Sequence, residues 1–224
     1  RSTLFPSTTL SRSALPWRAG GGGTSPEDLV ALSEEALLAE LESLRARAKH
    51  LLLDDPAPDL AQEHGALLSR PDAGLTRVID RSTPWTELPD TEEGGAFFSF
   101  ATRQHHYQRQ VDLQLAAGRL STGFAGLDTG VVVDLGVLSL AQAEHHAEAA
   151  RLAALEYPHG AAQEVQRARQ RELQHYPVPA IEGHAYLVRA ILPGRHDHLV
   201  AFEVLRKDDY GIVIAWRVLE SWPV

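Results

Sequence analysis

The densest group of side chains that could bind a metal lies near the C-terminus, where His196 and His198 flank Asp197. Glu203 follows five residues after His198, and His184 precedes the group in the chain. Imidazole nitrogens and carboxylate oxygens are common ligands of zinc and other divalent metals. The candidate metal ligands are therefore His184, His196, His198 and Glu203, and the sequence leaves the identity of any cofactor unknown.

The order of His196, His198 and Glu203 is similar to the first metal motif of cupin barrels. The resemblance implies that the two histidines hold a metal together with the glutamate. It covers only a short segment of the chain. The second motif of that family, which contains a later His, has no room before Val224. The resemblance therefore supports a metal-binding hypothesis but does not extend to a whole cupin barrel.

The expected local geometry limits that hypothesis. On one continuous strand over residues 198–206, His196 and His198 share a face, because side chains alternate along a strand. Glu203 is an odd number of residues away and faces the other side. A metal site then needs a bulge, or a third ligand from elsewhere such as His184. The alternative is a pair of exposed histidines at the mouth of a turn, which we favour because closely spaced histidines alone are a weak zinc signal.

A second group of potential ligands runs from Glu144 to Glu148, in a segment expected to be helical. On one continuous helix, His145 and Glu148 are three residues apart and therefore meet on one face, as do Glu144 and Glu148. A divalent metal accepts such ligands. The same residues also suit the solvated face of an Ala-rich helix, and the His-Glu-x-x-His motif of zinc proteases is absent. We favour the solvated face.

A third group lies between two expected strands, in a segment that is locally basic although the protein is acidic. In an extended segment every second residue points to the same side, which gathers Arg103, His105, Tyr107 and Arg109. Arginine and histidine side chains there could hold a carboxylate or a phosphate. The alternative is a solvated edge strand whose charges discourage aggregation. These four residues are the candidate ligand-binding residues.

Several common catalytic motifs are absent. The glycine-rich segment over residues 123–130 lacks both the Gly-Lys-Ser/Thr of a P-loop and the glycine spacing of a dinucleotide site. No Gly-x-Ser-x-Gly elbow of a serine hydrolase occurs. The chain has no cysteine, which excludes disulfides, thiolate metal sites and a cysteine nucleophile. The catalytic residues, if the protein is an enzyme, are unknown from the sequence.

The composition is that of an ordinary globular protein, with 44% hydrophobic and 23% charged residues among 224. The formal net charge of −9 disfavours long-range attraction to nucleic acids and acidic membranes. No apolar run is long enough to span a bilayer. Abundant Ala, Leu, Gly and Arg suggest a GC-rich bacterial genome. We expect a bacterial, cytoplasmic protein that binds neither nucleic acid nor membrane.

The N-terminal part divides into three segments. Residues 1–24 contain no Met, resemble translated adaptor sequence at their start and end in a glycine run, so we interpret them as an artefactual or disordered head and linker. Residues 25–55 predict a helical segment with leucines at helical spacing. Residues 56–95 are rich in proline and predict an irregular connection with a short helix near residues 60–68.

Residues 96–224 predict an α+β domain. The sequence predicts strands over residues 96–102, 111–115, 119–124, 130–135, 185–192, 198–206 and 212–219. Regular alternation supports 111–115 and the last two, while residues 96–102 are aromatic and residues 130–135 are apolar throughout most of their length. Two helices are expected, over residues 140–157 and 161–175. Sequential strands joined by short turns pair antiparallel. The predicted fold is therefore a mostly antiparallel β-sheet with helices packed on one face, preceded by an N-terminal helix.

These observations favour a non-catalytic module that binds a protein or a small ligand, or has an accessory role. The alternative is a His-based, metal-dependent enzyme of hydrolase type, in which a carboxylate serves as general base for metal-bound water. Nucleic-acid binding through residues 103–109 ranks third, because the protein is acidic. The partner is unknown, and both a protein partner and a second copy of the chain remain open.

Overall fold

The structure is a computed structural model that describes residues 34–41, 43–44, 58–83, 95–105, 111–123, 128–173 and 176–224. The chain divides into two compact units, Arg1–Glu42 and Ser43–Val224. In the first unit, residues 34–41 form a helix, as the sequence predicted for the N-terminal segment. The expected head and linker over residues 1–24 lie outside the described residues.

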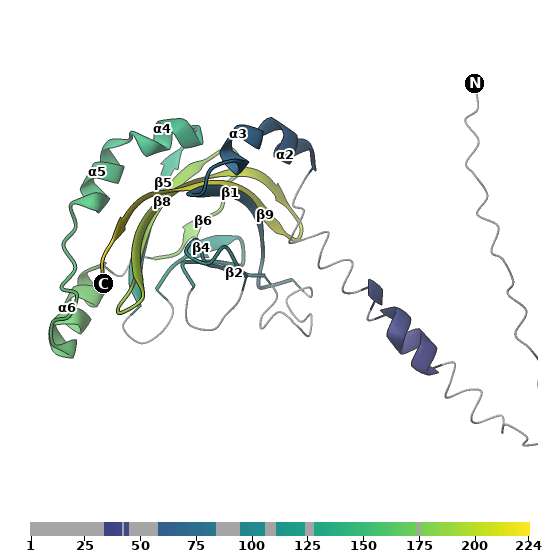
Figure 1. The fold of residues 1–224 in the computed structure, drawn as a ribbon, viewed down its shortest axis with the longest axis horizontal. Coiled ribbons are helices and arrows are strands. Elements are labelled where there is room, and N and C mark those ends of the chain that lie inside the picture. The colour runs from purple at the N-terminus through teal and green to yellow at the C-terminus, as the bar shows by residue number, and fades with distance from the viewer. Residues whose placement is uncertain are drawn as a thin grey trace, which may run out of the picture. The chain divides into compact units, whose positions relative to one another are not determined.

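The second unit is built on a curved five-stranded sheet in which every neighbouring pair of strands is antiparallel (Figure 1). Its strands, in spatial order, are β1 (Ala73–Ile79), β9 (Gly211–Trp222), β8 (His196–Asp208), β7 (Ala185–Leu192) and β5 (Thr129–Gly136). The strands expected over residues 185–192, 198–206 and 212–219 are all present, and the last two are longer than predicted. The α+β fold class is confirmed.

A smaller antiparallel sheet lies in the concavity of the large one (Figure 1). Its strands, in spatial order, are β2 (Phe97–Phe98), β3 (Leu113–Ala116), β4 (Arg119–Ser121) and β6 (Val178–Pro179). The main core fills the space between the sheets and is rich in aromatic rings, including Phe98, Phe100, Tyr186, Phe202 and Trp216. Burial of such large side chains is the main contribution to folding stability.

Helices cover the convex face of the large sheet, as predicted (Figure 1). They are α2 (Pro58–Glu63), α3 (Gly65–Leu68), α4 (Leu140–Glu144), α5 (Ala147–Ala153) and α6 (Gln163–Leu173). A second core forms beneath them and includes Val131, Leu140, Leu152, Leu187 and Leu199. No helix among the described residues is long and apolar enough to cross a membrane.

The helix expected over residues 140–157 is instead two short helices. Ser139 caps α4 with a capping box to Gln142, and His146 caps α5 by accepting a hydrogen bond from the Glu148 backbone N–H. A histidine that caps a new helix cannot lie inside the previous one. Glu144 ends α4 and pairs with Arg217 of β9. Residues 144–148 therefore do not lie on one continuous helix, and the spacing required by the alternative metal site is not formed.

The irregular connection expected over residues 56–95 is the largest difference from the prediction. The short helix is present as α2 and α3, but residues 73–79 form β1, which pairs along its whole length with β9. Its adjacent polar residues, Thr76 and Arg77, break the alternation by which strands are recognised. Gly74 lies against Trp216, and a Cβ there would be 2.8 Å from the indole ring. Residues 58–83 thus belong to the same unit as residues 96–224.

The first predicted strand of the α+β domain, over residues 96–102, is also shorter than expected. Only Phe97 and Phe98 are in β2, and the chain then turns at Arg103, whose φ is 56°. A single bridge between Ser99 and Gln104 closes the turn. The hairpin expected after residue 111 is present as β3 and β4, and its turn places Ala117 and Gly118 at positive φ.

Candidate functional site

His196 and His198 lie at the start of β8 and share the face that points to the small sheet, as predicted. Their rings stack with centroids 4.7 Å apart and an angle of 15° between their planes. His196 is buried, and its Nε2 lies 2.5 Å from Oδ1 of the buried Asp112. His198 is half-buried, and its Nδ1 lies 2.8 Å from the hydroxyl of Ser221. The two histidines therefore have separate partners.

The other two candidate metal ligands lie elsewhere. Glu203 faces the helices and accepts a hydrogen bond of 2.8 Å from the backbone N–H of Leu140. His184 precedes β7 and its Nδ1 lies 3.0 Å from Asp134. The register pairs Ala185 with Glu203 at one end of the strands and Leu192 with His196 at the other. His184 lies opposite Val204, eight residues along β8 from His196, so at about 3.3 Å per residue the two histidines are roughly 25 Å apart.

The structure therefore does not gather His184, His196, His198 and Glu203 into one site. Within the described ranges, no group of three or more His, Asp or Glu side chains is placed to hold a metal.

The surroundings of the histidine pair favour uncharged imidazole at His198. Burial lowers the pKa of His198, and the neighbouring His196 lowers it further. A neutral ring can accept a proton from the Ser221 hydroxyl. Asp112, by contrast, also accepts hydrogen bonds from the Phe100 backbone N–H at 2.7 Å and from the Ser99 hydroxyl at 3.2 Å. Its carboxylate ties the turn after β2 to the start of β8.

The basic segment expected to bind an anion is only partly described. The Arg103 guanidinium lies over the Trp216 ring at 5.4 Å from its centroid. His105 contacts the Thr76 hydroxyl at 3.1 Å and the Phe97 carbonyl at 3.3 Å, and its ring centroid lies 5.0 Å from that of Phe98. Tyr107 and Arg109 lie outside the described residues, so their part in the prediction stays a prediction.

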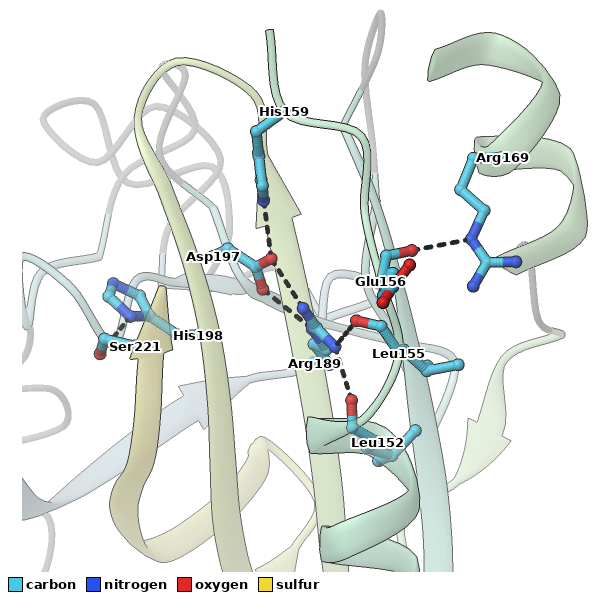
Figure 2. A network of polar contacts seen from close by, with 9 residues as sticks. All are labelled: Leu152, Leu155, Glu156, His159, Arg169, Arg189, Asp197, His198 and Ser221. Atoms are coloured by element: carbon cyan, nitrogen blue, oxygen red, sulfur yellow. Dashed lines mark hydrogen bonds and ion pairs between the residues drawn. The ribbon is translucent and has the colours of Figure 1, made fainter. Parts of the chain in front are cut away.

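A buried polar network lies at the start of β8, on the face opposite to His196 and His198 (Figure 2). Asp197 is fully buried and accepts two hydrogen bonds of 2.9 Å from the Arg189 guanidinium. Its Oδ2 also lies 2.9 Å from Nε2 of His159. Arg189 donates further hydrogen bonds to the carbonyls of Leu152 and Leu155, at 2.6 and 2.5 Å. A paired, bidentate arrangement of this kind is what allows such charges to be buried.

The network fixes the chain segment that leaves α5. Arg189 donates to one carbonyl in the last turn of that helix and to one just after it, and the His159–Asp197 contact holds the chain a few residues later. The Trp222 ring covers the guanidinium of Arg189, whose central carbon lies 4.0 Å from the ring centroid. These contacts hold residues 155–160 in a fixed position against the large sheet. This segment forms one wall of a pocket.

An open pocket of about 510 Å³ lies between this wall and α6. Its lining residues are Glu156, Tyr157, Pro158, Val165, Ala168, Arg169 and Glu172. Arg169 bridges the two sides, since its Nε donates to the Glu156 carbonyl at 3.1 Å and its Nη1 pairs with Glu172 at 2.7 Å. Figure 2 shows Arg169 reaching from α6 toward Glu156. The pocket is therefore part apolar and part charged.

Two buried polar atoms beside the pocket have no hydrogen-bond partner among the described residues: the Tyr157 hydroxyl and Nδ1 of His159. The two rings are in contact, with centroids 4.8 Å apart. Burial raises the pKa of Tyr157, and the charges of Asp128 and Asp197 raise it further. Buried polar groups in proteins nearly always have partners. The described residues therefore supply no hydrogen bond to these two atoms beside the pocket.

Sequence reasoning missed this region. The sequence predicts Tyr157 as the last residue of a helix and leaves His159 in the break between two helices. It gives Asp197 only as the residue between two histidines. One signal could have found the network: Arg189 interrupts an otherwise apolar strand, Ala185–Leu192, that is buried throughout. An arginine at such a position needs a buried carboxylate partner. The sequence could not tell which of the 30 acidic residues supplies it.

Comparison with known proteins gives no relative for this chain: no family model matches it, and no match was found among curated proteins or solved structures. The site is therefore interpreted from its geometry.

Proposed function

We propose that this chain is a non-catalytic module that binds a small ligand in the pocket between α6 and residues 156–158. The observation that carries the proposal is the pocket itself, together with the two buried polar atoms beside it that lack partners. Its volume falls in the range of about 300–1,000 Å³ that is typical of small-molecule sites.

The character of the lining supports this proposal. Tyr157, Pro158, Val165 and Ala168 offer apolar surface, while charged side chains stand beside them. Ligand sites commonly combine apolar walls with a few polar groups that fix orientation. One wall is also preorganised, because the Arg189–Asp197–His159 network holds it in place. A preformed wall reduces the entropy lost when a ligand binds.

A screen of small metabolites against the full chain by thermal denaturation tests the proposal. A ligand present at one hundred times its dissociation constant stabilises the fold by about 2.7 kcal/mol, which raises Tm by roughly 5–11 °C for a domain of this size. Ala168→Phe places a ring in the pocket and should abolish the shift. Ala150→Phe is the matched control, since Ala150 is an exposed position on α5 that does not line the pocket.

The two variants give clear outcomes. A shift that survives in Ala168→Phe places the ligand elsewhere and contradicts the proposal, and so does a screen in which no compound stabilises the folded chain. A shift lost equally in both variants reports a general change of stability instead of occlusion. Loss in Ala168→Phe alone supports the pocket.

A second candidate function is His-dependent hydrolysis, and one observation favours it. The Ser221 hydroxyl lies 2.8 Å from Nδ1 of His198, whose lowered pKa favours the neutral form that a general base requires. A nucleophile and a base within hydrogen-bond reach are the minimum for acyl transfer. Hydrolysis of p-nitrophenyl acetate above the background rate, lost in Ser221→Ala, would support this candidate. A rate unchanged in Ser221→Ala removes it.

A further inference from the structure

We infer that the pocket selects a small organic cation, with an ammonium group carried on an apolar body. The inference rests on the proposed function and specifies the ligand class. It starts from the two carboxylates of the pocket lining, which can only accept hydrogen bonds. Glu156 and Glu172 are carboxylates at its rim. No described residue donates to the Glu156 carboxylate, which leaves it free to bind a cation.

His159 adds a further acceptor. Its Nε2 faces Asp197, a carboxylate that already accepts two hydrogen bonds from Arg189. An ionised carboxylate only accepts, so Nε2 carries the proton in the neutral ring and Nδ1 presents a lone pair. That Nδ1 is buried without a partner and next to the Tyr157 ring. His159 follows directly after the lining residue Pro158. In this tautomer a ligand that donates an N–H group can satisfy Nδ1, whereas a carboxylate or phosphate leaves it unpaired.

Arg169, the one basic side chain among the described lining residues, does not reverse this preference. Arg169 is committed to the pocket's own wall, through Glu172 and the Glu156 carbonyl. With two carboxylates and one guanidinium, the charged lining has a net charge of −1 (−2 + 1). The chain as a whole carries −9, which raises the local concentration of cations at its surface.

The apolar part of the lining defines the rest of the ligand. Tyr157 presents an aromatic ring, and aromatic faces attract ammonium groups. Pro158, Val165 and Ala168 supply aliphatic surface next to it, which favours a body of several carbon atoms over a metal ion or a bare ammonium. An aryl-alkyl or branched alkyl amine combines both features.

Three probes of nearly equal shape test the ligand class by isothermal titration calorimetry with the full chain. They are phenethylamine, 2-phenylethanol and phenylacetate, which carry a positive, a neutral and a negative head group. We expect phenethylamine to bind most tightly and phenylacetate most weakly. The affinity for phenethylamine should fall as salt is raised from 50 to 500 mM, because part of the attraction is electrostatic and solvent-exposed.

Single charge removals connect that preference to the pocket. Glu156→Gln should weaken phenethylamine binding about threefold, the size expected for one exposed ion pair, and should leave 2-phenylethanol unchanged. Glu63→Gln is the matched control, because it removes the same charge from an exposed position on α2, outside the pocket. Equal weakening in both variants would show that only net charge matters and would overturn the inference.

The outcomes separate the inference from the function on which it rests. If 2-phenylethanol or phenylacetate binds as tightly as phenethylamine, and Ala168→Phe abolishes that binding, the pocket is a ligand site but the cation preference is wrong. If Ala168→Phe leaves phenethylamine binding intact, or if none of the three probes binds, the pocket does not hold this class of ligand. Where the metabolite screen also finds no ligand, the proposed function fails as well.

Discussion

The two faces of residues 196–198 contain similar side chains but differ in how those side chains are used. On the helix-covered face, Asp197 is fully buried and its carboxylate is shared between Arg189 and His159. On the other face, His196 is buried against Asp112, while His198 is half-buried next to the exposed Ser221. The start of β8 thus has a fully buried network on one face, which we call the closed face, and a half-exposed histidine on the other, which we call the open face.

This difference shows that burial, more than residue type, separates positioning from reactivity. A fully buried carboxylate that is held by three polar contacts, as Asp197 is, can hold backbone segments in place but cannot exchange partners without a large penalty. A half-exposed histidine with a lowered pKa can gain or lose a proton at little cost. Side chains of the first kind build the wall of the proposed pocket, and those of the second kind offer chemistry at the surface.

The largest expected effect is on the closed face. Asp197→Ala leaves the buried Arg189 without its counter-charge and frees His159, so we expect a loss of about 3–5 kcal/mol in the free energy of unfolding. Urea denaturation followed by circular dichroism measures it. Asp209→Ala is the matched control, because Asp209 is an exposed turn residue, and should change the same quantity by about 0.5 kcal/mol or less.

A double replacement sharpens this result. Arg189→Met with Asp197→Leu removes both charges and fills similar volume, so it should recover much of the lost stability. If the double variant is as unstable as Asp197→Ala, the network stabilises the fold through the backbone hydrogen bonds of Arg189 and not through its charge pair.

A smaller loss is expected on the open face. Asp112→Asn keeps an oxygen for the Phe100 N–H but weakens the contact with His196. We expect a decrease of about 1–3 kcal/mol in the free energy of unfolding, the range for a compromised buried hydrogen bond. The same urea titration applies, and a loss as large as that of Asp197→Ala would contradict the contrast between the two faces.

The pH dependence of His198 provides a third test. Because its pKa is lowered in the folded state, the unfolded chain binds the proton more readily near pH 6.5, the ordinary value for histidine. Its contribution to stability is therefore present above that pH and is lost as the pH falls through the folded pKa. NMR titration of the His198 ring should give a midpoint below 6.5, and a normal or raised midpoint would contradict burial as the cause.

The smallest expected effect is at the surface. Ser221→Ala removes one exposed hydroxyl that contacts His198, so the free energy of unfolding should change by about 0.5 kcal/mol or less. The pKa of His198 should still lie below 6.5, because burial and His196 are its main causes. A stability loss above about 1 kcal/mol would mean that the open face is as rigid as the closed one.

The sequence predicted much of the fold but little of the site. Strands β7, β8 and β9 could be recognised because their alternation is regular and their turns are short. Strand β1 could not, since its polar residues are adjacent and its partner, β9, lies more than 130 residues away. The shared face of His196 and His198 followed from strand periodicity alone. Strand periodicity did not indicate their separate partners, Asp112 and Ser221.

The sequence by itself determined the local properties of this protein: the α+β class, the antiparallel hairpins, the capped helix at Ser139 and the overall negative charge. These depend on periodicity and on neighbours a few residues apart. Only the tertiary structure decided which polar groups meet. Asp112 reaches His196 across 84 residues, and Asp197 reaches His159 across 38. Such pairs depend on strand register and on the packing of layers, which no local pattern encodes.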